Sequence, residues 1–183
     1  MHPRNRRNAT RRKGGKVLLL LPCTNKKPYS EAPTWKFIMK RIEPWLDHVD
    51  LAAVDCIINP RTNKPFGIVT RRQERLTVGK DERPDPAKLP GLTIEIRKKL
   101  ERLSPKYTQV VSYLNVKTYW QAVQALSDDF GIEMLPSIYH KNENWNGKIA
   151  HSGPIGVFKR EVPELQEALT RYTGIPPNGH SSK

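Results

Sequence analysis

The residue types best suited to chemistry stand together in one short segment, Pro22–Tyr29 (PCTNKKPY). It combines the thiol of Cys23, the amines of Lys26 and Lys27 and the phenol of Tyr29. A neighbouring cation can lower the pKa of a thiol and turn it into a nucleophile, and a lysine can also neutralise a phosphate or a carboxylate. A tyrosine can stack on a base or donate a hydrogen bond. Close packing inside the protein is the alternative role for both Cys23 and Tyr29.

The element before this segment must hold it in place. Residues 16–21 (KVLLLL) contain the continuous apolar run Val17–Leu21, which is typical of a strand that is covered on both faces. The run is far shorter than the ~20 residues of a membrane span, so we expect no membrane partner. Pro22 ends the strand, and Pro22 and Pro28 stiffen the loop, which favours a site of fixed geometry.

The rest of the chain alternates between strand and helix patterns. This alternation predicts an α/β fold with a mainly parallel central sheet and helices on both faces. A three-layer arrangement similar to that of uracil-DNA glycosylases fits this layout. We expect a disordered basic arm at 1–15, a single domain at 16–174 and a flexible tail at 175–183. The expected strands are 16–21, 50–58, 66–69, 107–114 and 132–139, and the expected helices are 34–46, 91–104, 116–130 and one that ends before Gly174.

Polar residues follow several of these strands. In parallel sheets ligands bind at the carboxyl ends of the strands, so we expect these residues to share one rim. The segments concerned are Pro22–Tyr29, Asn59, Arg71–Glu74, Asn115 and His140.

The charge balance indicates an anionic partner. The chain has 183 residues, with 32 Lys and Arg against 18 Asp and Glu, which gives a net charge of +14. Nucleic acid, either DNA or tRNA, is the expected partner. The first sixteen residues contain no acid, and their basic side chains suit a phosphate backbone, although a solvated tail is the alternative. The expected nucleic-acid-binding residues of the arm are Arg4, Arg6, Arg7, Arg11, Arg12 and Lys13.

The cysteine and histidine content argues against a metal or a disulfide. Cys23 and Cys56 form no CxxC pair, and Cys56 stands in an apolar strand where we expect it to be part of the core. His140 and His151 have no convincing third ligand. We therefore expect no metal, no cofactor and a reducing cytoplasmic location. The oligomeric state stays open.

The pattern Pro22-Cys23-x3-Lys27-Pro28-Tyr29 resembles the core domain of archaeosine synthase, a family related to archaeal tRNA-guanine transglycosylases. The segment Gly67–Glu74 (GIVTRRQE) is similar to a second segment of that family. Two polar members of the family signature are replaced, the serine by Ala32 and the histidine by Trp35. We expect this chain to lack the RNA-binding accessory domains of that family, because it is short.

The resemblance implies an enzyme that adds an amine to the nitrile of a 7-cyano-7-deazaguanine base, in DNA, in tRNA or as a nucleotide. It implies catalytic roles for Cys23, Lys27 and Glu74. The replacements at Ala32 and Trp35 leave open a changed nucleophile or a lost activity. The expected substrate-binding residues are Pro22, Asn25, Lys26, Tyr29, Arg71, Arg72 and Asn115.

Two other functions stay open. The first is a nucleic-acid-binding module that keeps the fold without the chemistry, as the replacements at Ala32 and Trp35 suggest. The second is a glycosylase-like enzyme that cleaves a base from its sugar, because His151-Ser152-Gly153-Pro154 resembles a short motif of uracil-DNA glycosylases.

Overall fold

The structure is a computed structural model that describes residues 16–24, 28–77, 86–139 and 154–177. The predicted arm at 1–15 and most of the predicted tail lie outside the described residues.

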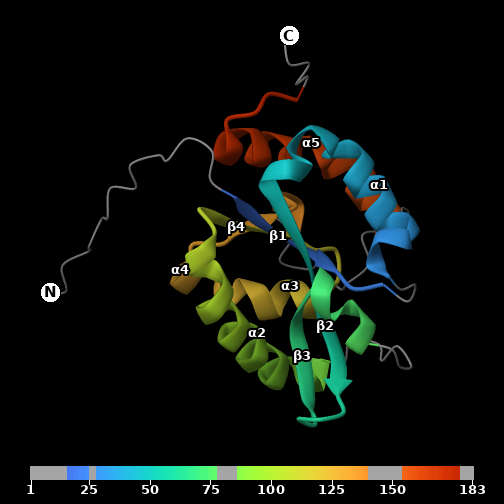
Figure 1. Cartoon of the computed structure of the whole chain (residues 1–183), viewed down its shortest axis with the longest axis vertical. Helices are drawn as coiled ribbons and strands as arrows, with labels where there is room; N and C mark the ends of the chain where they lie inside the picture. Colours follow the sequence, from blue (N-terminus) through green and yellow to red (C-terminus); the bar gives the residue numbers. More distant parts are fainter. Residues whose placement is uncertain (1–15, 25–27, 78–85, 140–153, 178–183) are drawn as a thin grey trace, which may run out of the picture.

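Five strands form one sheet in the order β3-β2-β1-β4-β5 (Figure 1). Strand β1 lies in the centre and runs parallel to both of its neighbours, β2 and β4, and β5 is parallel to β4. Only β3 is antiparallel, and it pairs with β2. The strands are β1 (Val17–Pro22), β2 (Val49–Asn59), β3 (Lys64–Thr70), β4 (Gln109–Tyr113) and β5 (Glu133–Leu135).

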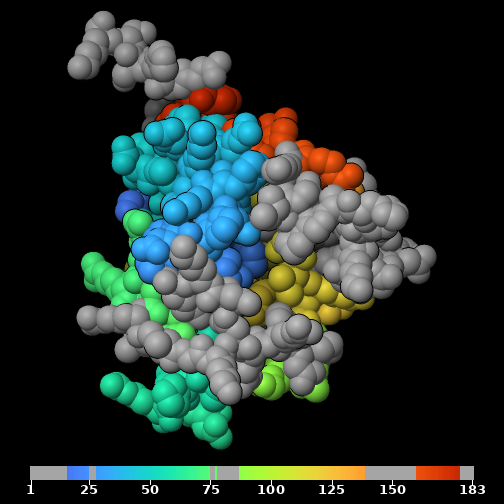
Figure 2. Space-filling view, turned by 90° about the vertical axis from the view of Figure 1, so that its right-hand side faces the viewer, coloured from blue at the N-terminus to red at the C-terminus, as the bar shows by residue number. Residues whose placement is uncertain are grey.

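Helices cover both faces of the sheet (Figure 1). One face packs against α1 (Pro33–Arg41), the 3-10 helix η2 (Glu43–His48) and α5 (Pro154–Thr173). Figure 2 shows α1, in blue, close to α5, in orange and red. The other face packs against α2 (Leu89–Leu103) and α3 (Lys117–Gln124). The mainly parallel, three-layer α/β prediction is confirmed.

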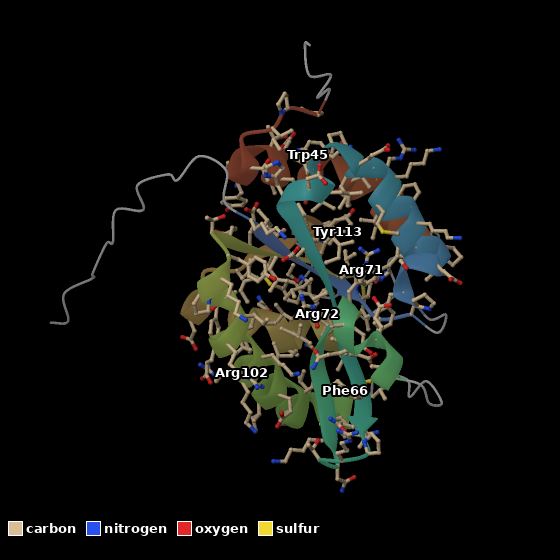
Figure 3. All side chains as sticks on the ribbon, in the orientation of Figure 1. Trp45, Phe66, Arg71, Arg72, Arg102 and Tyr113 are labelled. Carbon is tan, nitrogen blue, oxygen red and sulfur yellow. The ribbon has the colours of Figure 1, made fainter. Side chains whose placement is uncertain are left out.

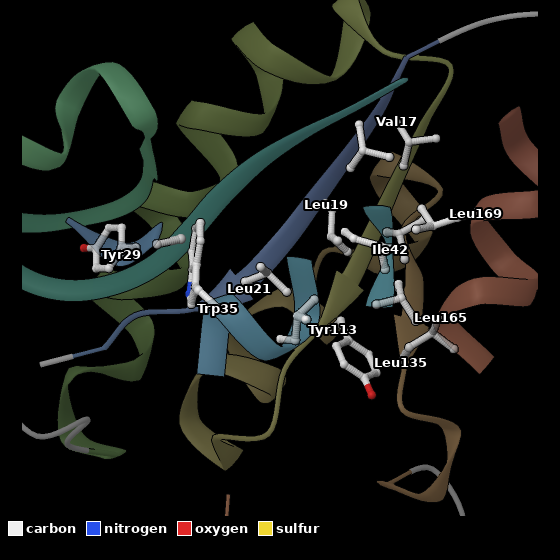
Figure 4. Packing of buried hydrophobic residues seen from close by; sticks show 14 of the residues in the cluster. Val17, Leu19, Leu21, Tyr29, Trp35, Ile42, Tyr113, Leu135, Leu165 and Leu169 are labelled. Carbon is white, nitrogen blue, oxygen red and sulfur yellow. The ribbon is translucent and has the colours of Figure 1, made fainter. Parts of the chain in front are cut away.

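The sequence of β1 explains its central position. Val17, Leu19 and Leu21 enter the core beneath α1 and α5 (Figure 4), whereas Leu18 and Leu20 enter the core beneath α2 and α3. All five side chains are buried. Burial of each contributes roughly 1.5–3 kcal/mol, so a strand with apolar residues at every position is stable only between two layers of helices.

Three predicted elements are shorter than expected. The helix predicted at 34–46 ends at Arg41, and Pro44 lies in the first turn of η2, where its missing N–H costs nothing. The helix predicted at 116–130 is divided between α3 and the short α4 (Ser127–Phe130). The last strand ends at Leu135 and is followed by the 3-10 helix η6 (Ser137–Tyr139).

The remaining 3-10 helices are connectors. They are η1 (Tyr29–Glu31), η3 (Arg71–Leu76), η4 (Pro86–Lys88) and η5 (Ser104–Lys106). No helix in the described ranges is long and apolar enough to cross a membrane.

Candidate functional site

Cys23 stands directly after β1, at the carboxyl end of the central strand. Its backbone N–H donates to the carbonyl of Val54 at 3.1 Å, so the residue still follows the sheet. Its thiol is half-buried, and Sγ lies 2.9 Å from Oη of Tyr119. The cysteine is therefore held by the backbone and by a polar neighbour at the place where ligands of parallel sheets bind.

Tyr119 comes from the first turn of α3 and lies under Cys23. Its ring is buried, and its hydroxyl donates to Sγ of Cys56 at 3.4 Å. Burial, followed by the nearby sulfurs of Cys23 and Cys56, raises the pKa of Tyr119 above its ordinary value. The phenol therefore keeps its proton when a neighbouring thiol loses one, and it can donate that proton in a hydrogen bond to the thiolate.

The sequence pattern did not reveal Tyr119 as a site residue. Tyr119 falls on the apolar face of its helix, where a tyrosine is normally part of the core. Its ring does belong to the core, and only its hydroxyl reaches Cys23. The one available signal was that Tyr119 lies in the first turn of the helix that follows β4, because the connections after parallel strands form the ligand-binding rim.

Asn115 is brought to the same rim, as predicted. Strand β4 is the parallel neighbour of β1, and Asn115 follows its last residue, Tyr113, by two positions. Asn115 and Cys23 therefore both lie beyond the carboxyl ends of neighbouring parallel strands.

Tyr29 is placed differently from the prediction. Its side chain is fully buried and stacks on Trp35, with ring centroids 5.3 Å apart (Figure 4). Its hydroxyl donates to Oδ2 of the buried Asp55 at 2.5 Å. Burial and then the charge of Asp55 raise the pKa of Tyr29, so it stays a phenol. A ring in this position cannot stack on a substrate base, and Tyr29 positions the loop instead.

Trp35 has a clear structural role next to Cys23. Its indole N–H donates to the carbonyl of Pro22 at 2.9 Å, directly before Cys23. Ala32 is also buried and belongs to the same core cluster. Trp35 therefore holds the backbone that carries Cys23.

Glu74 reaches the predicted loop from another element. It lies in η3, is buried, and accepts the backbone N–H of Tyr29 through Oε2 at 3.2 Å. The structure thus brings Glu74 to the predicted loop segment Pro22–Tyr29. The contact is to the backbone of the loop, which indicates a positioning role for the carboxylate.

Arg71 and Arg72 are not on this rim, and the single-rim prediction is wrong for them. Strand β3 runs antiparallel to β2, with Thr70 opposite Ala52 and Gly67 opposite Asp55. The carboxyl end of β3 therefore points toward the amino ends of the parallel strands. Figure 3 shows both arginines next to β2, and they line a groove together with Lys16 and Asp50.

Several predicted residues lie outside the described part of the chain. They are the loop residues Asn25, Lys26 and Lys27, the arm residues, and His140 and His151. Within the described part, no group of three or more His, Cys, Asp or Glu side chains is arranged to hold a metal ion.

Comparison with known proteins gives no functional relative. No protein-family model matches the chain, and no curated protein matches it. A solved structure described as AF0587, a protein of unknown function, is similar, with a TM-score of 0.47 and 18% identity. The similarity covers 87% of this chain and about half, 53%, of the length of that structure.

Proposed function

We propose that this chain is a nucleic-acid base-modifying enzyme in which Cys23 attacks the nitrile of a 7-cyano-7-deazaguanine base. The supporting observation is the half-buried thiol of Cys23 at the carboxyl end of the central strand, 2.9 Å from the Tyr119 hydroxyl. The resemblance of Pro22-Cys23-x3-Lys27-Pro28-Tyr29 to the archaeosine synthase core domain and the net charge of +14 support the substrate class.

The chemistry would proceed in two steps. The sulfur of Cys23 forms a bond to the nitrile carbon, one C–N π pair moves to nitrogen, and that nitrogen takes the proton that the thiol gives up. An amine then attacks the same carbon and loses a proton as the C–S bond breaks, which regenerates the thiol and leaves an amidine. Tyr119 stabilises the thiolate that attacks in the first step and the thiolate that leaves in the second, because its hydroxyl donates a hydrogen bond to the sulfur.

Mass spectrometry tests this proposal directly. The protein is incubated with DNA and tRNA that contain the nitrile base, together with ammonium or free lysine, and the nucleosides are analysed. We expect the modified nucleoside to gain the mass of the amine with the wild type and not with Cys23→Ala. Without an amine, an adduct should accumulate on Cys23. A nitrile that stays unchanged with both donors, and no adduct on the protein, would exclude the enzymatic proposal.

One observation favours a second candidate, a nucleic-acid-binding module without catalysis. The carboxylate of Glu74 and the hydroxyl of Tyr29 both make hydrogen bonds inside the protein, so two residues expected at the substrate have structural roles. This candidate predicts salt-dependent nucleic-acid binding that is the same in Cys23→Ala and in the wild type. A large loss of binding in Cys23→Ala would argue against it.

A further inference from the structure

A second feature lies at the opposite end of β1 from Cys23. Strand β3 pairs with β2 only from Ala52 onward, so among the described strands residues 49–51 of β2 have a neighbour on one side, β1. A groove of about 720 Å³ lies along this free edge and is lined by Val49, Asp50 and Leu51. Met39 and Leu46 line it from the side of α1 and η2, and Leu103 lines it from α2. The face shown in Figure 3 contains this edge.

Basic side chains dominate the polar lining of the groove, which contains Lys16, Arg71, Arg72 and Lys106 against Asp47 and Asp50. Asp50 is already neutralised, because it accepts from Lys16 and from the hydroxyl of Tyr107, both at 2.9 Å. Within the ranges that the structure describes, no carboxylate forms an ion pair with Arg71, Arg72 or Lys106. The groove therefore offers three cations to an external anion.

The basic arm is attached at the same place. Lys16 lines the groove, and the residues that precede it in the sequence include six further Lys or Arg and no acid. The cations of the groove and those of the arm are therefore joined through one residue. Several cations in one groove suit a polyanion with repeated charges better than a single small anion.

We propose that this groove binds the phosphodiester backbone of a nucleic acid beside the base that enters the Cys23 site. This inference rests on the proposed function, because it takes the nucleic acid that carries the modified base as the occupant of the groove. Lys16 lies seven residues before Cys23, roughly 23 Å along the strand direction, and Thr70, directly before Arg71, is level with Leu20 through Ala52, roughly 10 Å before Cys23. Along one strand of a duplex these separations correspond to about three to seven nucleotides. Arg71 and Arg72 thus contact phosphates that flank the modified base and not the base itself.

The test compares two double variants of the full chain with the same change in charge. Arg71→Gln/Arg72→Gln removes two cations from the groove. Arg97→Gln/Arg171→Gln is the control, because these arginines pair with Asp129 and Glu133 near β5, at the other edge of the sheet. Binding to an unmodified DNA duplex of about 20 base pairs is measured by fluorescence anisotropy over a range of salt concentrations.

We expect the groove variant to bind about tenfold more weakly than the wild type, with the slope of log K against log salt reduced by about 2. The control variant should keep the wild-type slope. Equal slopes for the groove variant and the wild type would overturn the proposal. A glutamate homopolymer is the second probe. If it binds with the same dependence on the two arginines and the duplex does not, the groove is a site for an acidic protein and the proposal is wrong.

The probes contain no nitrile base, so this result does not depend on the chemistry at Cys23. Equal slopes for the groove variant and the wild type, together with active Cys23 chemistry, would reject the groove alone. A reduced slope for the groove variant, together with an unreacted nitrile, would reject the base-modification proposal alone. Melting curves of both double variants verify that each is folded.

Discussion

The Tyr119 hydroxyl and the Cys23 sulfur are 2.9 Å apart although 96 positions separate the two residues in the sequence. The same hydroxyl also reaches the buried sulfur of Cys56 at 3.4 Å. A phenol has a single proton to donate, so it can bond either sulfur. When Cys23 is a thiolate, donation to Cys23 becomes the stronger of the two hydrogen bonds because the acceptor is charged.

Removal of the Tyr119 hydroxyl should therefore slow the reactions of Cys23. Tyr119→Phe keeps the buried ring and removes a donor to a charged acceptor, which is worth about 1.5–3 kcal/mol. We expect alkylation of Cys23 by iodoacetamide near neutral pH to slow by about tenfold or more, as followed by intact-protein mass spectrometry. Tyr107→Phe, which removes a hydroxyl at the groove, is the matched control. An unchanged alkylation rate in Tyr119→Phe would show that the phenol does not assist the thiol.

The hydrogen bond from Trp35 to the carbonyl of Pro22 predicts a local effect on the site. Trp35→Phe leaves a buried carbonyl without this donor, and we expect unfolding in urea to become easier by about 1–3 kcal/mol. Trp45→Phe removes a similar hydrogen bond, to the carbonyl of Ile175. We expect both variants to lose comparable stability, whereas only Trp35→Phe should alter the alkylation rate of Cys23. Equal alkylation rates would mean that Trp35 supports the fold and not the geometry of the thiol.

Gly67 should tolerate no side chain. Its φ is +73°, and an added Cβ would lie 2.9 Å from the backbone of Glu95 and Ile96 in α2. Gly67→Ala combines an unfavourable backbone conformation, about 1–2 kcal/mol, with overpacking of about 1–3 kcal/mol. We expect a loss of about 2–5 kcal/mol in urea unfolding.

Gly131→Ala is the control for this prediction. Gly131 has a similar φ of +61°, and an added Cβ would meet nothing within 4 Å. It should lose only the backbone part, about 1–2 kcal/mol. If the two alanine variants were equally stable, α2 would not be packed against β3 as closely as the structure indicates.

Asp50 and Tyr107 should make the stability depend on pH in the alkaline range. Burial and then the hydrogen bond to Asp50 raise the pKa of Tyr107 from 10.0 to about 12. A tyrosine whose pKa is raised on folding stabilises the protein below its unfolded pKa, and this contribution is lost as the pH rises from about 10 to 12. Asp50→Asn should lower the pKa of Tyr107 toward 10 and reduce this loss.

The absorbance of phenolate during a base titration measures this shift. Burial and then a hydrogen bond to Glu133 raise the pKa of Tyr172 to about 12. Glu133→Gln is therefore a parallel variant. Each substitution should lower the pKa of one of these two tyrosines and leave the pKa of the other unchanged. Identical titration curves for Asp50→Asn and the wild type would contradict the Asp50–Tyr107 contact.

Much of the framework could be predicted from the sequence because burial leaves a strong periodic signal. The run Val17–Leu21 identified the central strand, and Pro22 marked its end, so the position of Cys23 at a strand terminus could be predicted. The apolar spacing in 91–104 likewise identified α2 with nearly correct ends.

The direction of β3 was missed although a signal existed. The connection between β2 and β3 spans only residues 60–63, and a parallel crossover needs about a dozen residues. The short turn therefore requires an antiparallel hairpin, which places Arg71 away from Cys23. The contacts of Tyr29, Trp35 and Glu74 could not be predicted, because they join segments that only the folded chain brings together.

The position of β1 in the middle of the sheet has a consequence for hydrogen exchange. Its backbone is paired with β2 on one side and β4 on the other, and its side chains are covered by helices on both faces. We expect amides in such a strand to exchange mainly when the whole domain opens, whereas residues 58–59 of β2 pair with β3 beyond the end of β1 and can open locally. We therefore expect Cys23 to be attached to one of the most slowly exchanging of the described elements, away from the hairpin tip.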